Sequence, residues 1–91
     1  MMKVAQLIND KGNPAANQFV FRDDKQVIFQ SYNTIIAKVE GRQVYFTDGA
    51  LNHSKTTTKH LRIFLKKYAG IDKTTKDLRK MLEDGTIKIY E

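Results

Sequence analysis

Residues 18–47 decide the fold, and they read QFVFRDDKQVIFQSYNTIIAKVEGRQVYFT. Apolar side chains recur at every second position, as at Phe19 and Phe21 or Val27 and Phe29, in four runs: residues 18–22, 26–30, 34–40 and 43–47. This alternation is typical of strands that bury one face. Only two or three polar or glycine residues separate the runs, and connections this short join antiparallel neighbours. The stretch therefore predicts a four-stranded antiparallel meander.

Three local features qualify this pattern. In the third run, Ile35 and Ala37 are expected on one face, and Ile36 breaks the polar pattern of the other face. Before the meander, residues 3–8 fit either a fifth strand or a short helix, and the strand is favoured. Residues 9–17 hold the only proline of the chain and are expected to form a loop.

The spacing of apolar residues changes after Gly49, from every second residue to every third or fourth. Ser54 or Thr56 can cap the start of a helix that runs to about Ala69, where Gly70 stops it. The apolar stripe of this helix is expected to face the sheet and consists of Leu61, Phe64, Leu65 and Tyr68.

A second helix and a last strand complete the predicted order. Thr74 and Asp77 form a capping-box pattern with Asp in place of Glu, and Gly85 ends this helix. Its buried face is expected to hold Leu78, Met81 and Leu82. Residues 86–90 then alternate as a strand. The predicted architecture is one α+β domain over residues 1–91: an antiparallel β-meander of four to five strands, then two helices on one face of the sheet, and a C-terminal strand.

Composition narrows the classes of function. The chain has 91 residues, of which 41% are hydrophobic and 29% charged, and it has no cysteine. It therefore has no disulfide, thiolate metal ligand or cysteine nucleophile. The first ten residues are too polar for a signal sequence, and no apolar run approaches the roughly 20 residues of a membrane span. A cytoplasmic protein without a membrane partner is expected, and a homodimer that shares a sheet edge or a helix face remains open.

Charge is concentrated in the second half of the chain. The formal net charge is +6, and residues 51–91 carry +5 of it, from ten basic and five acidic residues. Residues 54–69 contain no acid. Four of their cations recur at i, i+4, i+7 and i+11, on one face of a helix over roughly 17 Å: Lys55, Lys59, Arg62 and Lys66. A second basic patch is expected from Lys67, Lys76, Arg79 and Lys80.

Helix energetics do not explain this arrangement, because like charges four residues apart repel each other. The pattern therefore predicts an anion-binding surface, most commonly one for a nucleic-acid backbone. The competing interpretation is a lysine-rich face that only improves solubility.

The start of this helix resembles a phosphate-binding motif. Residues 49–56 differ by one substitution from G-x-x-x-x-G-K-[ST], with Ser54 in the place of the second glycine. An antiparallel sheet of this size leaves no room for a parallel nucleotide-binding core. A single phosphate is the remaining expectation, held by N–H groups at the helix start with Ser54, Thr56 and Thr57.

Catalytic and metal chemistry are not predicted. His53 and His60 are seven residues apart, which is too far for two helical residues to share one metal. Ser54 and His60 fall on different sides of a helix and cannot act together as nucleophile and base. No enzyme activity, cofactor or metal is expected.

Two segments resemble a known family. Residues 29–37 read FQSYNTIIA and residues 54–65 read SKTTTKHLRIFL. They are similar to the F-x-S-Y-x-x-x-I-A strand and the S-x-T-T-x-x-H-L-x-x-F-L helix opening of small uncharacterised proteins from phages, plasmids and bacterial genomes. The resemblance covers residues 18–69. It implies a mobile-element setting and no catalytic residue, because this family carries no assigned activity.

Two hypotheses of function follow. The first is a nucleic-acid-binding accessory protein of a mobile element or phage, which contacts the backbone without reading sequence. The alternative is a protein-interaction module, such as a phage-encoded inhibitor or regulator, whose basic helix binds an acidic protein surface.

Overall fold

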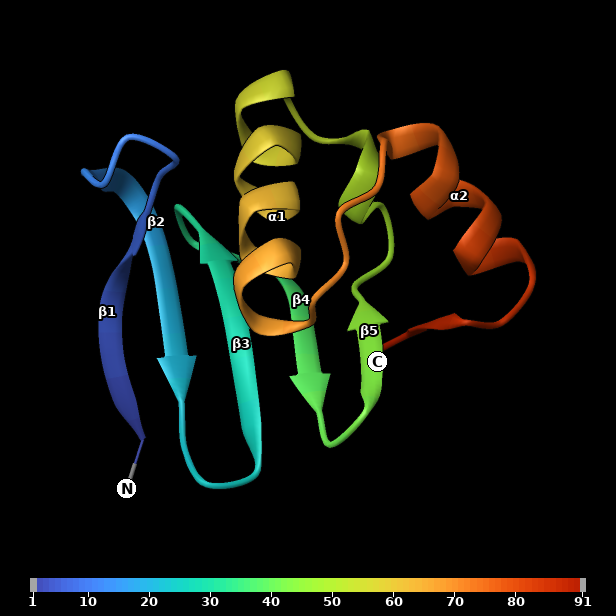
Figure 1. The fold of residues 1–91 in the computed structure, drawn as a ribbon, viewed down its shortest axis with the longest axis horizontal. Helices are drawn as coiled ribbons and strands as arrows, with labels where there is room; N and C mark the ends of the chain where they lie inside the picture. The colour runs from blue at the N-terminus through green and yellow to red at the C-terminus, as the bar shows by residue number, and fades with distance from the viewer. Residues whose placement is uncertain (1, 91) are drawn as a thin grey trace.

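A computed structural model describes residues 2–90 as a six-stranded sheet with two α-helices (Figure 1). In chain order the elements are β1 (Lys3–Ile8), β2 (Pro14–Arg22), β3 (Gln26–Ser31), β4 (Thr34–Glu40), β5 (Gln43–Phe46), the 3₁₀ turn η1 (Ala50–Asn52), α1 (Lys55–Tyr68), α2 (Thr75–Glu83) and β6 (Ile87–Ile89). Helix α1 crosses one face of the sheet over β3 and β4, and α2 lies on the β6 side. The α+β prediction is confirmed, and residues 3–8 form a strand.

The strands follow one another across the sheet in chain order, from β1 to β6. Neighbours are antiparallel except for β5 and β6, which are parallel. A parallel pair needs a long crossover connection, and η1, α1 and α2 supply it between these two strands. The final strand covers residues 87–89, two residues fewer than predicted.

Strand β2 begins earlier than the sequence suggested, so the predicted loop over residues 9–17 was too long. A tight turn over residues 9–13 reverses the chain, closed by a 2.8 Å bond from the Asn9 N–H to the Asn13 carbonyl. Pro14 then opens the strand, a position where its missing N–H is tolerated. Ala15 follows and is buried.

The sequence predicted that Ile35 and Ala37 share a face of the sheet. This prediction is wrong, because β4 contains a β-bulge between them. Phe29 pairs with Ala37, but Gln30 pairs with Ile35, so Ile36 is an extra residue without a partner on β3. Both Ile36 and Ala37 are fully buried as a result, while Ile35 is only half-buried.

The predicted ends of α1 are confirmed. Ser54, not Thr56, is the N-cap, and its Oγ accepts a 3.2 Å hydrogen bond from the Thr57 N–H. At the other end Gly70 has φ +68°, a left-handed conformation that glycine adopts without a steric penalty. Thr74 caps α2 in the same way as Ser54 caps α1.

The core lies between α1 and the sheet. Phe29 of β3 and Phe64 of α1 stack with ring centroids 5.4 Å apart, and both rings are fully buried. Ile63 is also buried, although it lies outside the predicted apolar stripe. Phe19 and Phe21 belong to the opposite face of the sheet and are half-buried. Within residues 2–90, neither helix has the length and apolar character to cross a membrane.

Candidate functional site

The four cations of the predicted row lie on the outer side of α1. Leu61, Phe64 and Leu65 are drawn into the core, which turns the opposite side of the helix to solvent. The side chains exposed there, called the basic stripe from here on, are Lys55, Lys59, Arg62 and Lys66.

Within residues 2–90 no carboxylate forms an ion pair with the basic stripe. The one ion pair within residues 2–90 joins Lys38 to Glu40 at 3.9 Å, on the face of the sheet away from α1. The Arg62 Nε–H donates a 3.0 Å hydrogen bond to the Lys73 carbonyl in the segment between α1 and α2. This bond fixes the guanidinium and leaves its other N–H groups free for an anion.

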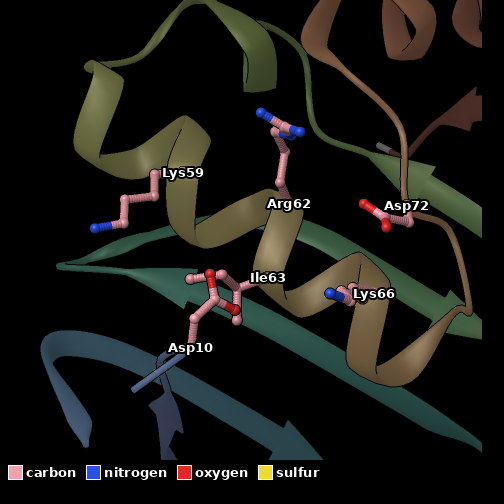
Figure 2. A pocket seen from close by; sticks show the side chains of 6 residues that line it. All are labelled: Asp10, Lys59, Arg62, Ile63, Lys66 and Asp72. Atoms are coloured by element: carbon pink, nitrogen blue, oxygen red, sulfur yellow. The ribbon is translucent and has the colours of Figure 1, made fainter. Parts of the chain in front are cut away.

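One hollow beside the stripe has mixed charge. It has a volume of about 200 Å³, and its lining residues are Asp10, Lys59, Arg62, Ile63, Lys66 and Asp72. Asp10 and Asp72 reach α1 from two different segments of the chain (Figure 2). Three cations and two carboxylates give this loop-side hollow a net charge of only +1.

A second hollow is more strongly positive. It has a volume of about 340 Å³, and its lining residues are Leu51, His53, Lys55, Thr58, Lys59, Arg62 and Thr75. It has three cations, two hydroxyls and no carboxylate. Thr75 is the first residue of α2, whose N-terminal N–H groups add partial positive charge. Of the two hollows, this helix-side hollow offers an anion the better environment.

The predicted second patch is divided. The Lys67 ammonium donates to the Ile8 carbonyl at the end of β1, on the far side of α1 from α2. Lys76, Arg79 and Lys80 share a face of α2 and are exposed. Arg79 donates 3.3 Å hydrogen bonds to the Leu51 carbonyl and to Asn52 Oδ1, which places it beside the helix-side hollow.

Two of the three predicted phosphate ligands at the start of α1, Ser54 and Thr57, form hydrogen bonds within the protein. Ser54 Oγ caps the helix and lies 3.3 Å from Thr57 Oγ1. The Thr57 hydroxyl is buried and lies 3.2 Å from Ser31 Oγ, so it joins the helix to β3. Ser54 and Thr56 remain exposed, and the Thr56 carbonyl lies 2.7 Å from His60 Nδ1.

Within residues 2–90 two carboxyls have shifted pKa values, and both lie in turns at the protein surface. A hydrogen bond from the Lys25 N–H lowers the pKa of Asp23. Hydrogen bonds from the hydroxyl and N–H of Thr86 lower the pKa of Asp84. Both shifts favour an ionised turn residue, which is a structural role.

Sequence reasoning missed the groups that surround the stripe. Asp10, Asp72, Thr75 and the Lys73 carbonyl come from the β1–β2 turn, the α1–α2 segment and the start of α2. Only the packing of these elements brings them to α1, and no local pattern signals it.

The two segments that carry the family resemblance meet in space. Phe29 stacks on Phe64, and Ser31 hydrogen-bonds to Thr57, so the strand motif and the helix motif hold each other. These matched residues explain how α1 is fixed on the sheet.

The molecule is thus a small α+β protein with a basic helical surface. The chain belongs to a family of unknown function (DUF8033), whose family model matches residues 2–81. The prediction of an uncharacterised family is confirmed, and the matched range is longer than the predicted residues 18–69. No curated protein and no solved structure matches the chain.

Proposed function

We propose that this protein is a small non-enzymatic module that binds the backbone of nucleic acid through the basic stripe, as an accessory protein of a bacterial mobile element or phage. The observation that carries the proposal is the exposure of Lys55, Lys59, Arg62 and Lys66 on one face of α1 without a carboxylate partner within residues 2–90. Cations arranged in this way attract a chain of phosphates.

The dimensions of the stripe suit a nucleic-acid backbone. Its length of roughly 17 Å matches about five base pairs at 3.4 Å each. The helix-side hollow gives the backbone a concave, carboxylate-free path between α1 and the start of α2. Arginine is present at only four positions in the chain, so lysine contacts to phosphates dominate and little sequence reading is expected.

The first test compares two charge-reversal variants. Lys59→Glu, Arg62→Glu and Lys66→Glu together change the stripe, whereas Lys25→Glu, Arg42→Glu and Lys88→Glu change exposed basic residues elsewhere. Each triple change lowers the net charge by six, from +6 to 0, so the two variants differ only in where the charge is lost. Fluorescence anisotropy with a generic DNA duplex and a generic RNA measures the affinity.

Four phosphate contacts predict a salt slope near −3.6, or a loss of affinity of about 150-fold between 50 and 200 mM salt. The stripe variant is expected to lose on the order of 100-fold in affinity at 50 mM salt, and the control variant much less. Equal losses in two folded variants would show that net charge alone attracts the polymer, and would remove the stripe from the proposal.

One observation favours the alternative of an acidic protein partner. Asp10 and Asp72 line the loop-side hollow together with three cations, and a protein surface of both signs can pair with such a mixture. This inhibitor or regulator function predicts a complex that survives nuclease treatment and excess DNA. Absence of DNA and RNA binding by the unmodified protein at 50 mM salt would favour it.

A further inference from the structure

Exposed apolar side chains gather at one edge of the sheet. Within residues 2–90 the exposed large apolar residues are Met2, Val4, Ile8, Tyr32 and Ile89. Three of the five belong to β1 or precede it directly, and Val4 is the most exposed at 59%. Figure 1 shows β1 at the outer edge, paired only with β2.

These side chains point away from α1. Ala5 pairs with the buried Val20, whereas Val4 pairs with Phe21 on the opposite face of the sheet. The β1–β2 register shifts between Gln6 and Ile8, but the extra residues lie on β2, so side chains still alternate along β1. Gln6 and Ile8 share the face of Val4, and Leu7 between them is buried. The outer face of β1 is therefore Val4, Gln6 and Ile8, beside the half-buried Phe21.

Apart from the register shift in the β1–β2 pairing, this edge lacks the usual protections against pairing. Sheet edges are commonly blunted by charges, proline or a very short strand. β1 has six residues, no proline and Lys3 as its only charge, while β6 at the other edge has only three residues. The bond from Lys67 to the Ile8 carbonyl holds the end of β1 against α1, so the edge is fixed in place.

We propose that β1 pairs antiparallel with β1 of a second copy of this chain, with Gln6 opposite Gln6. This register places Val4 of each copy opposite Ile8 of the other, so the two large apolar side chains exposed on the strand cover each other. Lys3 then comes opposite Asn9, and no like charges meet. The pairing is self-complementary, as a twofold interface requires, whereas the strand of an unrelated protein would have no reason to match it.

Two consequences follow from this geometry. The two sheets join edge to edge into one sheet, with both α1 helices on the same face. Six residues per copy make a small interface, so a reversible dimer is expected that dissociates at low micromolar concentration. The dimer does not depend on the proposed function, because strand pairing involves no phosphate.

A single cysteine tests the register directly, because the natural chain has none. Gln6→Cys places two thiols directly opposite each other, with Cβ atoms about 4.5–5.5 Å apart, close to disulfide distance. Lys88→Cys on β6 is the matched control on the other edge. Under mild oxidation Gln6→Cys is expected to form covalent dimers at least on the order of 10-fold faster, because pairing raises the local thiol concentration.

One mixed sample, compared with its two components alone, refines the register. Val4→Cys and Ile8→Cys are each expected to crosslink slowly alone and rapidly when mixed, because residue 4 faces residue 8 of the other copy. Equal crosslinking rates for Gln6→Cys and Lys88→Cys would overturn the proposal.

Sedimentation equilibrium provides the second measurement. The unmodified chain is expected to pass from monomer to dimer with rising concentration, equally at 50 and 500 mM salt. Val4→Lys with Ile8→Lys, both at exposed positions, is expected to stay monomeric with an unchanged circular dichroism spectrum. A monomer at every concentration, or a dimer that persists in this variant, contradicts β1 pairing. The two proposals can fail separately, because the dimer is expected to be insensitive to salt, whereas nucleic-acid binding is expected to weaken as the salt concentration rises.

Discussion

Polar residues inside this protein are few and lie together. Gln18, Ser31 and Thr57 are the buried polar residues of the described chain. Gln18 pairs with Ser31 across β2 and β3, and Ser31 Oγ lies 3.2 Å from Thr57 Oγ1. Because a buried hydroxyl without a partner costs free energy, the Ser31–Thr57 bond specifies how the first turn of α1 sits on β3.

This pair predicts a coupled effect on stability. Ser31→Ala or Thr57→Val alone leaves the other hydroxyl without this partner and is expected to lower the free energy of unfolding by about 1–3 kcal/mol. The double variant is expected to lose less than the sum, because no unpaired hydroxyl of the pair remains. Urea unfolding measures each value, and Thr56→Val at an exposed position of the same turn is the control. Strict additivity would show that the two hydroxyls act independently.

At the scale of elements, the sequence predicts what local spacing determines. The capping side chain of Ser54 and the left-handed Gly70 bound α1 within one residue of the prediction. The bulge at Ile36 could not be predicted in the same way, because it depends on the partner strand β3. The parallel pairing of β6 also required tertiary information, since a short alternating segment fits either direction.

For the candidate site, too, the sequence predicts what local spacing determines but not what depends on packing. Helical spacing alone places Lys55, Lys59, Arg62 and Lys66 on one face. The two hollows depend on how distant segments pack against α1, and the predicted second patch was divided because Lys67 and α2 lie on different sides of that helix.

The turn between α2 and β6 depends on an ionised side chain. The Thr86 hydroxyl donates a 2.6 Å hydrogen bond to Asp84 Oδ1 and the Thr86 N–H a 2.8 Å bond, which lower the pKa of Asp84 below its ordinary value of 3.8. Because the pKa of Asp84 is lower in the folded state, the ionised side chain stabilises the fold at pH values above its ordinary pKa of 3.8. This contribution is lost as the pH falls through the lowered pKa.

Asp84→Ala is therefore expected to be less stable than the unmodified protein at pH 7. The difference should shrink below about pH 4 and disappear at still lower pH. Urea unfolding at a series of pH values gives this comparison. Glu83→Ala, at a neighbouring exposed position with no hydrogen bond to Thr86, is the control. A gap between Asp84→Ala and the unmodified protein that stays constant down to pH 2 would contradict the ionised turn.

At the scale of the whole molecule, the two flanks of α1 differ in charge. The stripe gathers cations from one helix, whereas Asp10 and Asp72 come from segments about sixty residues apart in the chain and meet on one flank of it. A polyanion is attracted less strongly on that flank, where the loop-side hollow has a net charge of +1, than on the flank of the helix-side hollow, which has no carboxylate. The fold thus gives the surface of α1 a preferred side for an anionic ligand.

Neutralising the two carboxylates on that flank tests this asymmetry together with the proposed function. Asp10→Asn with Asp72→Asn is expected to raise affinity for generic DNA about two- to fivefold at 50 mM salt, because a unit charge some 8–10 Å from a phosphate contributes about 0.5 kcal/mol in water. Asp24→Asn with Glu40→Gln adds the same charge at the opposite end of the sheet from the Asp10 turn (Figure 1). If both pairs raise affinity equally, the effect comes from net charge. An unchanged affinity for the Asp10 and Asp72 pair would place the bound backbone away from α1.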